Sequence, residues 1–477
     1  MPTATADQLL EQARILPYAT EPIAKDRILV TGYFGGWAFL SEDELRLLRT
    51  EDIHSSMRLY AKLRDAGIII NGENINTAAG IYANLNKSLL QAPSLHMINT
   101  TNMCNNRCRY CHAGVSMGKD MMSLETAEKV VDFIFSCASR YATIEFQGGE
   151  CLLNWKVVRR VVEKAREMNK GGKRDLHMCI VSNLLLMDRE KLDFLIDNDV
   201  AICSSIDGTK AIHDANRRTS AGGDTFDKTV DKVRFIKETY EKRGLPKKVD
   251  MLATITRTAL SDPRGIIDTY VSLGTATVHL RPVHDLGDAL NSWPDLSYTP
   301  EEFFAFWKEA MDYIIELNRR GTRIMERGAF NILCKILRYR DPLYVELMSP
   351  TGMGRSTLLY NFDGAIFSSD EGRMIPERIF QIGTVDQPAG EVLGSEDNQN
   401  TWASSFMDLI AYHSAFRPWG GVHPVHVYQA QRTIIPNISR SATFKIYRMQ
   451  CKYLFEKIAE NGFEKELFLD WATKVIF

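Results

Sequence analysis

Three cysteines stand close together in the segment CNNRCRYC. Cys104 is followed by Cys108 after three residues, and Cys111 comes after two more. Three thiolates can hold three irons of a cubane cluster, whereas a complete set of protein ligands would need four cysteines. The spacing therefore predicts a 4Fe-4S cluster whose fourth iron stays open to another ligand.

Zinc is an alternative reading of the same segment, with His112 as a fourth ligand directly after Cys111. Zinc sites usually consist of two ligand pairs separated by a longer loop, so a site within CNNRCRYCH would be cramped. Incidental thiols are a third reading. The spacing favours the cluster. An open iron could chelate the amino and carboxylate groups of S-adenosylmethionine (SAM), and the protein would supply orientation and shielding.

The elements that must position these cysteines alternate between strands and helices from about residue 95 to 310. The strand SLHMINTT leads into the cysteine loop. Five further strands end in TIEFQGGE, HMCIVSN, AICSSIDG, VDMLATITR and TVHLRPV. This order predicts βαβ units and a parallel α/β sheet, which six strands would curve into a partial (β/α)6 barrel. Ligands bind at the carboxyl ends of parallel strands, where the cysteine loop and these strand ends meet.

We assign residues 91–310 to the barrel, and one further region lies on each side of it. For residues 1–90 we predict a small winged-helix-like module with two strands around the Gly35-Gly36 turn. One of its helices begins at Ser41, and a second helix ends at Gly67. Residues 311–477 predict an α+β extension with a hairpin that turns at Asp363-Gly364.

The composition of the chain bears on which kinds of partner it binds. The 477 residues are 45% hydrophobic and 25% charged, with 58 basic and 60 acidic side chains. A net charge of -2 gives no electrostatic reason to expect nucleic acid or a membrane as partner. No apolar stretch approaches the roughly 20 residues of a membrane span, and the N-terminus does not look like a secretion signal. Nine cysteines, an odd number, do not suggest a disulfide framework, so we expect a cytoplasmic protein.

The cysteine segment with Tyr110, followed by EFQGGE, resembles the radical SAM superfamily. The resemblance implies that Gly148, Gly149 and Glu150 hold the amino group of SAM. Glycines allow close backbone approach, and a carboxylate suits an ammonium group.

The segment SSIDGTKAIHDANR resembles the peptide-modifying branch that includes sulfatase maturases. This resemblance implies that Ser182, Asn183 and Ser205 contact the ribose or carboxylate of SAM, and that Arg217 also binds this cofactor. Ser182 and Asn183 could instead form only a turn at the strand end.

The closest overall resemblance is to the radical SAM maturase of the His-Xaa-Ser peptide system. It rests on RILVTGYFGGWAFLS, EFQGGECLLN, SPTGMGRSTLLYNFDGAIFSSDEGRM and FRPWGGVHPVHVY. It implies crosslinking of side chains in a small ribosomally made precursor peptide, and a reductase or a flavodoxin- or ferredoxin-type electron donor. The N-terminal module would hold the leader peptide as an added strand, or serve only as a structural cap.

The C-terminal region departs from this family. Many relatives carry a SPASM domain with about seven cysteines, but only Cys334 and Cys451 follow residue 203 here. The resemblance sets the segment Phe367-Ser368-Ser369-Asp370 against YPCD of relatives, and Ser414 and Gly420 against the cysteines of CxFRPxCG. We therefore predict a SPASM-like scaffold without auxiliary clusters. The alternative, that His413, His423 and His426 replace those ligands, is less favoured.

Asp370 keeps the position that follows the missing cysteine. The matching aspartate of sulfatase maturases is a proposed base, so Asp370 is the catalytic candidate, unless it only makes a turn hydrogen bond. Two other functions compete with peptide crosslinking: radical SAM chemistry on a protein side chain or small molecule, and a non-catalytic peptide-binding descendant. Three exposed thiolates would serve no purpose in the latter.

Overall fold

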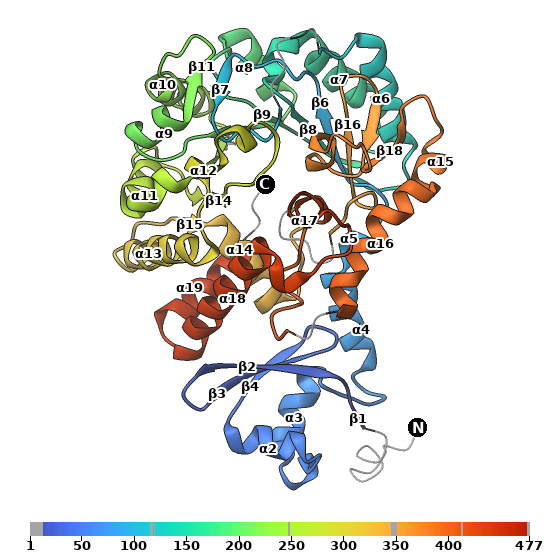
Figure 1. Ribbon diagram of the computed structural model, residues 1–477, viewed down its shortest axis with the longest axis vertical. Helices are drawn as coiled ribbons and strands as arrows, with labels where there is room; N and C mark the ends of the chain where they lie inside the picture. Colours follow the sequence, from blue (N-terminus) through green and yellow to red (C-terminus); the bar gives the residue numbers. More distant parts are fainter. Residues whose placement is uncertain are drawn as a thin grey trace.

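The computed structural model describes residues 13–114, 118, 120–246, 249–344, 351–411 and 414–474. Its main element is a nine-stranded sheet with the order β14-β12-β10-β9-β8-β6-β16-β17-β18 (Figure 1). Six neighbouring strands run parallel: β6 (Leu95–Asn99), β8 (Tyr141–Gln147), β9 (Asp175–Val181), β10 (Val200–Ser205), β12 (Val249–Ile255) and β14 (Leu280–Pro282). The predicted α/β fold with a parallel sheet is confirmed.

Helices alternate with these strands and cover the outer face of the sheet (Figure 1). They are α6 (Leu124–Ser136), α7 (Trp155–Met168), α8 (Arg189–Asp197), α9 (Lys210–Asn216), α10 (Phe226–Lys242), α11 (Pro263–Ser272), α12 (Trp293–Leu296) and α13 (Pro300–Arg319). Burial along β8 alternates, with Ile144 and Phe146 fully buried and Glu145 and Gln147 half-buried. Because side chains of a strand point to opposite faces in turn, Glu145 and Gln147 lie on the inner face.

The C-terminal region continues the same sheet. Strand β16 (Thr357–Tyr360) pairs in parallel with β6, and β17 (Ala365–Phe367) and β18 (Gln381–Thr384) follow antiparallel (Figure 1). The hairpin between β16 and β17 turns at Asp363-Gly364 as predicted, with Gly364 at φ 87°. The domain boundary that we predict at residue 310 falls inside α13. The main sheet contains strands from both of the regions that this boundary separates.

The remaining helices of the C-terminal region are α14 (Arg327–Arg338), α15 (Ala389–Gly394), α16 (Glu396–Ala411), α17 (Pro424–Gln431), α18 (Ala442–Glu460) and α19 (Phe463–Thr473). Of these helices, α15 and α16 pack against β18, whereas α14, α18 and α19 pack on one another, and α18 also packs on α13. Short strand pairs complete the fold: β7 (Asn106–Cys108) with β11 (Arg217–Thr219), and β13 (Thr277–Val278) with β15 (Met325–Glu326). Within the described ranges, no helix is long and apolar enough to cross a membrane.

The N-terminal module contains a three-stranded antiparallel sheet of β2 (Tyr18–Ala24), β3 (Arg27–Gly32) and β4 (Trp37–Leu40). The helices α2 (Glu42–Arg49) and α3 (Met57–Asp65) pack on one face of it, and α4 (Ile75–Leu85) and α5 (Lys87–Leu90) lead toward the body of the molecule (Figure 1). Strands β3 and β4 and the start of α2 were expected, whereas β2 adds a strand. Ser41 and Glu44 cap α2 in a reciprocal capping box.

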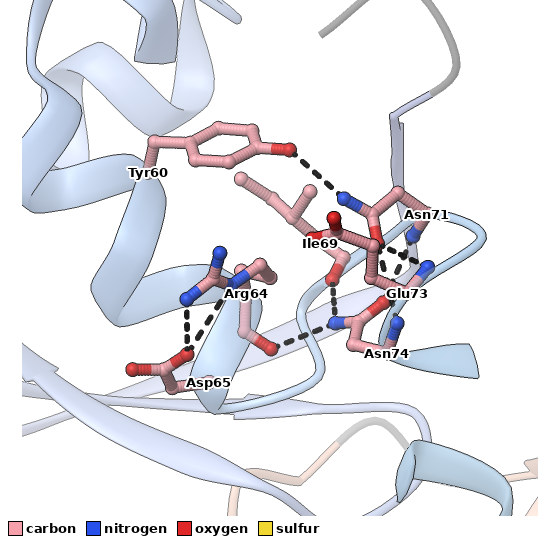
Figure 2. A network of polar contacts seen from close by, with 7 residues as sticks. All are labelled: Tyr60, Arg64, Asp65, Ile69, Asn71, Glu73 and Asn74. Atoms are coloured by element: carbon pink, nitrogen blue, oxygen red, sulfur yellow. Dashed lines mark hydrogen bonds and ion pairs between the residues drawn. The ribbon is translucent and has the colours of Figure 1, made fainter. Parts of the chain in front are cut away.

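Two asparagines fix the turn that leads from α3 into α4 (Figure 2). The Asn71 Nδ2 group donates to the Tyr60 hydroxyl at 3.3 Å, and Asn74 Nδ2 donates to the carbonyls of Arg64 and Ile69, both at 2.8 Å. These bonds tie the start of α4 to the end of α3 and to the short β5 (Ile69–Ile70), which pairs with β1 (Arg14–Ile15).

The other face of this small sheet packs on the C-terminal region. The Trp37 ring lies 5.0 Å from that of Phe455 in α18, and Trp37 Nε1 donates to the carbonyl of Ile336 at 2.9 Å. Glu21 of β2 pairs with Arg448 and Lys452 of the same helix. The module is thereby fastened to the body of the molecule through apolar contacts and ion pairs.

Candidate functional site

The cysteine loop follows β6 at the carboxyl end of the parallel strands. Cys104, Cys108 and Cys111 are half-buried and form no disulfide. Burial is the main cause that raises the pKa of Cys104 to about 11 and of Cys111 to about 12, and the neighbouring thiols raise both further. Three free thiols on one loop are the donor set that a cubane cluster takes from a protein, and bound iron would displace their protons.

The two glycines of the GGE segment pack against this loop. A Cβ on Gly148, whose φ is 131°, would lie 2.2 Å from Asn99 Oδ1, and one on Gly149 would lie 2.2 Å from the carbonyl of Met103. The amide of Gly149 donates to the carbonyl of Thr101 at 2.7 Å. Glycine is therefore required here because the loop backbone fills the space that a side chain would need.

Glu150 joins two of the predicted site segments. Its buried carboxylate accepts hydrogen bonds from the Ser182 hydroxyl and the Asn183 amide, both at 2.8 Å, and from the Leu152 amide at 3.0 Å. Asn183 Nδ2 in turn donates to Asn105 Oδ1 at 2.7 Å in the cysteine loop. Burial raises the pKa of Glu150, while these donors lower it. The structure thus brings together Glu150, Ser182, Asn183 and the cysteine loop.

Ser182 also makes the turn hydrogen bond that its strand-end position suggests, since its hydroxyl accepts from the Leu184 amide at 2.9 Å. Ser205 is the last residue of β10 and is half-buried. Its alternation with fully buried Ile202 and Ser204 places it on the inner face of the barrel. Both serines therefore lie at the carboxyl ends of barrel strands, as predicted.

Arg217 of β11 pairs with Cys108 of β7 and belongs to a series of buried polar side chains. Its Nη1 donates to the Tyr110 hydroxyl at 2.6 Å, and this hydroxyl donates to Asp207 Oδ1 at 2.8 Å. Burial raises the pKa of Asp207 to about 6. Sequence reasoning missed Asp207, although it belongs to the SSIDG segment, because only the fold brings Tyr110 to it.

Asp370 lies beside the cysteine loop, at the start of the short helix η6 (Glu371–Met374). Arg373 Nε donates to Asp370 Oδ1 at 2.9 Å, and His112 Nε2 lies 3.6 Å from its Oδ2. Burial alone would raise the pKa of Asp370, but Arg373 and His112 outweigh it and hold the pKa well below its usual range. Asp370 is therefore ionised but weakly basic, and its carboxylate makes no cap hydrogen bond to η6.

Arg373 attaches this aspartate to the cysteine loop. Its Nη1 donates to the carbonyl of Ala113 at 3.0 Å and to Asn102 Oδ1 at 3.2 Å. The side chain of His112 faces Asp370, so the structure gives the zinc reading no support from that side chain. Arg373 was not predicted as a site residue. The one signal in the sequence was that this basic side chain stands three positions after Asp370.

A group of histidines lies where the C-terminal region meets the barrel, with His423 buried and His284 and His426 half-buried. His423 Nε2 lies 3.5 Å from Glu371 Oε2, and the His426 ring stacks on that of His284 with centroids 4.1 Å apart. Burial lowers the pKa of His284 and His426 well below the usual value. His413 lies outside the described residues. In the described part of the chain, no three His, Cys, Asp or Glu side chains are arranged to hold a metal ion, and this finding covers the three cysteines of the loop as well as these histidines.

The two cysteines of the C-terminal region lie in the apolar core. Cys334 in α14 and Cys451 in α18 are fully buried in the main apolar core. Burial raises the pKa of both thiols, to about 12 for Cys451. They pack as small apolar side chains, and Ser368 and Ser369 are buried as well.

Comparisons with known proteins agree with the resemblance to radical SAM enzymes that the site residues suggested. Residues 98–253 match the family described as the radical SAM superfamily, which is less than half of the chain. Among curated proteins, a cysteine-type anaerobic sulfatase-maturating enzyme of Clostridium perfringens is 28% identical over 245 residues, which cover 49% of this chain and 63% of that enzyme. The match therefore spans less than two thirds of that relative.

Two solved structures share the fold. The enzyme anSMEcpe with bound AdoMet has a TM-score of 0.64 at 18% identity, covering 79% of this chain and 100% of that chain. Streptococcus suis SuiB bound to the precursor peptide SuiA has a TM-score of 0.52 at 12% identity, covering 87% of this chain and 96% of that chain. The likeness to SuiB extends the shared fold beyond residues 98–253 into both flanking regions.

Proposed function

We propose that this chain is a radical SAM enzyme that crosslinks side chains of a small ribosomally made precursor peptide. The observation that carries the proposal is the junction of the cysteine loop with Glu150, Ser182 and Asn183. Three free thiols, a buried carboxylate and strand-end polar groups meet at the carboxyl edge of a parallel sheet, where such folds bind ligands.

Cys104, Cys108 and Cys111 would hold one 4Fe-4S cluster. Glu150 would face the ammonium group of SAM, with Gly148 and Gly149 keeping the cysteine loop against it. Ser182, Asn183, Ser205 and Arg217 would contact the ribose or carboxylate. When bound, the cluster and SAM supply a 5′-deoxyadenosyl radical, which removes a hydrogen atom from the substrate. The residues of this chain orient both groups and exclude water from them.

Asp370 is our candidate for taking the proton that the substrate loses during crosslinking. Its place beside His112 and the cysteine loop supports the assignment. The ion pair with Arg373 limits its strength as a base, since a lowered pKa reduces the driving force for proton uptake. Substrate contacts that draw Arg373 away would raise its basicity.

The N-terminal module is our candidate for leader-peptide binding. In the sheet order β2-β3-β4, strand β4 forms one edge, while β2 at the other edge lies against α18. The outward carbonyl of Phe39 in β4 accepts a hydrogen bond from Lys62 Nζ at 3.2 Å, and Lys62 pairs with Glu44 at 2.6 Å. An extended leader segment would add to β4, as in other complexes in which a peptide adds a strand to an exposed sheet edge.

The solved structure of SuiB with its precursor peptide supports a peptide substrate, because its fold covers most of this chain. A second candidate is modification of a protein side chain, which the match to a sulfatase-maturating enzyme favours. In either case a reductase or a flavodoxin- or ferredoxin-type protein would supply the electron.

Anaerobic incubation with SAM and reductant tests the proposal, using short peptides encoded beside this gene and a sulfatase-derived peptide. We expect 5′-deoxyadenosine and a precursor peptide that has lost the mass of two hydrogens. Modification of the sulfatase peptide alone would favour the second candidate. If SAM is cleaved but every precursor peptide keeps its mass, the substrate assignment is wrong.

A further inference from the structure

A buried positive charge lies directly behind one cluster cysteine. Arg217 in β11 and Cys108 in β7 are paired residues of an antiparallel strand pair. Only 9% of Arg217 is exposed, so its charge is poorly screened by water.

The guanidinium is held in place by a chain of buried hydrogen bonds. It donates to the Tyr110 hydroxyl at 2.6 Å and lies 5.9 Å from the centre of that ring. Tyr110 donates to Asp207 Oδ1 at 2.8 Å, and Asp207 also accepts from the Thr254 amide at 3.3 Å. Since Tyr110 and Asp207 are themselves buried, Arg217 keeps one position relative to the cysteines.

The buried carboxylates near this cation are held by other groups. The Tyr110 hydroxyl stands between Arg217 and the carboxylate of Asp207, so these two charges are kept apart. Glu150 accepts hydrogen bonds from Ser182 and Asn183. The exposed neighbour Arg218 points elsewhere, with its Nε donating to the carbonyl of Asp214 at 3.1 Å.

We propose that Arg217 raises the reduction potential of the cluster on Cys104, Cys108 and Cys111, and that Tyr110 and Asp207 are its positioning residues. The inference rests on the proposed function. Reduction transfers one electron from the donor protein to the cluster and adds one negative charge. A fixed cation in a region of low dielectric stabilises this reduced form, so the potential rises.

The test is the midpoint potential of the reconstituted cluster, measured without SAM so that any role of Arg217 in SAM binding does not contribute. Arg217→Gln should shift the midpoint to more negative values, and Arg217→Lys should shift it less. Tyr110→Phe removes the hydroxyl that holds Arg217 and should shift it in the same direction by a smaller amount. Arg218→Gln is the matched control, because it removes one positive charge from the same strand and should leave the midpoint unchanged.

Iron and sulfide content is measured alongside the potential for each variant. A wild-type midpoint in Arg217→Gln, or equal shifts in Arg217→Gln and Arg218→Gln, would overturn the inference. If Arg217→Gln holds no cluster, Tyr110→Phe and Arg217→Lys decide, and midpoints at or above the wild-type value in both would overturn it. If the wild-type chain itself takes up no iron, the proposed function fails instead.

Discussion

The cysteine loop and the SPASM-like region predicted at residues 311–477 differ in how they hold their cysteines. In the loop, three free thiols stand beside glycines that leave no room for a side chain. In the SPASM-like region, strands β17 and β18 pair as part of the main sheet, and Cys334 and Cys451 are buried in the apolar core. The difference indicates that the first region offers thiols for iron, whereas the cysteines of the second region serve packing.

Apolar packing explains how the second region holds together. The Trp419 ring lies 4.9 Å from Phe455, and Phe416 packs on the same ring at 6.2 Å. A Cβ on Gly420 would lie 2.9 Å from Cβ of Tyr447, so the segment is tightly docked on α18. Burial of these aromatic rings stabilises the docking of this segment on α18.

The sharpest way to break the comparison is to remove one cysteine from each region. Cys108→Ala should abolish iron uptake and reduce SAM cleavage to background, because two thiolates cannot hold the cubane. Cys451→Ala, buried in the apolar core, should keep the iron content of the wild type. Iron analysis and chromatography of 5′-deoxyadenosine check both. Loss of iron from Cys451→Ala would mean that the second region does bind a cluster.

Asp370→Asn tests whether the second region contributes chemistry to the first. We expect product formation to fall about 10²-fold, the lower range for general acid–base catalysis, with iron content and SAM cleavage retained. The control is Asp363→Asn in the hairpin turn, where the carboxylate binds the Ala365 amide at 3.1 Å. Equal losses in both variants would assign Asp370 a structural role only.

The glycines of the GGE segment offer a more graded perturbation. Gly148→Ala places a Cβ 2.2 Å from Asn99 Oδ1 at a φ of 131°, which should cost roughly 2 kcal/mol or more and reduce cluster incorporation. Gly80→Ala in α4, with open space around it, should instead stabilise the helix by about 0.5–1 kcal/mol. Thermal unfolding and iron content distinguish the two. Full cluster content in Gly148→Ala would contradict the packing argument.

The smallest expected effect concerns pH and histidines of the barrel. Burial lowers the pKa of His96, His213 and His279 to about 3, so these rings stay neutral in the folded protein. An unfolded ring takes a proton near pH 6.5, so the unfolded chain binds more protons between about pH 6.5 and 3. Stability should fall by about 1 kcal/mol per pH unit per histidine as pH decreases through this window.

Melting curves of the metal-free protein between pH 8 and pH 5 check this slope. His96→Gln should reduce the slope, because one buried ring no longer resists protonation. The control His54→Gln, at an exposed position, should leave the slope as in the wild type. A slope that is unchanged in His96→Gln would show that this histidine does not govern the acid sensitivity.

The parts predicted from sequence are those that local patterns determine. Alternating strands and helices gave the parallel sheet, the spacing of CNNRCRYC gave the cysteine loop, and Asp363-Gly364 gave the hairpin turn. Contacts between distant segments were not predictable. Tyr110 meets Asp207 across 97 residues and Arg217 across 107, and no periodicity encodes such a meeting.

Glu150 and Asp370 were predicted as site residues, but their hydrogen-bond and ion-pair partners could be identified only from the structure. Glu150 was expected to face a ligand, but its carboxylate also organises Ser182 and Asn183. Asp370 was expected as a base, and its partners Arg373 and His112 weaken that role. Residue type suggested the chemistry, whereas the surrounding charges decide its strength.

The most direct test of the central claim is the iron and sulfide content of the anaerobically reconstituted chain, with spectra recorded before and after SAM is added. One cluster predicts about four irons per chain, a spectrum that SAM perturbs, and 5′-deoxyadenosine on reduction. About eight or more irons would contradict the claim that the SPASM-like region lacks a cluster. Zinc without iron would contradict the enzyme assignment itself.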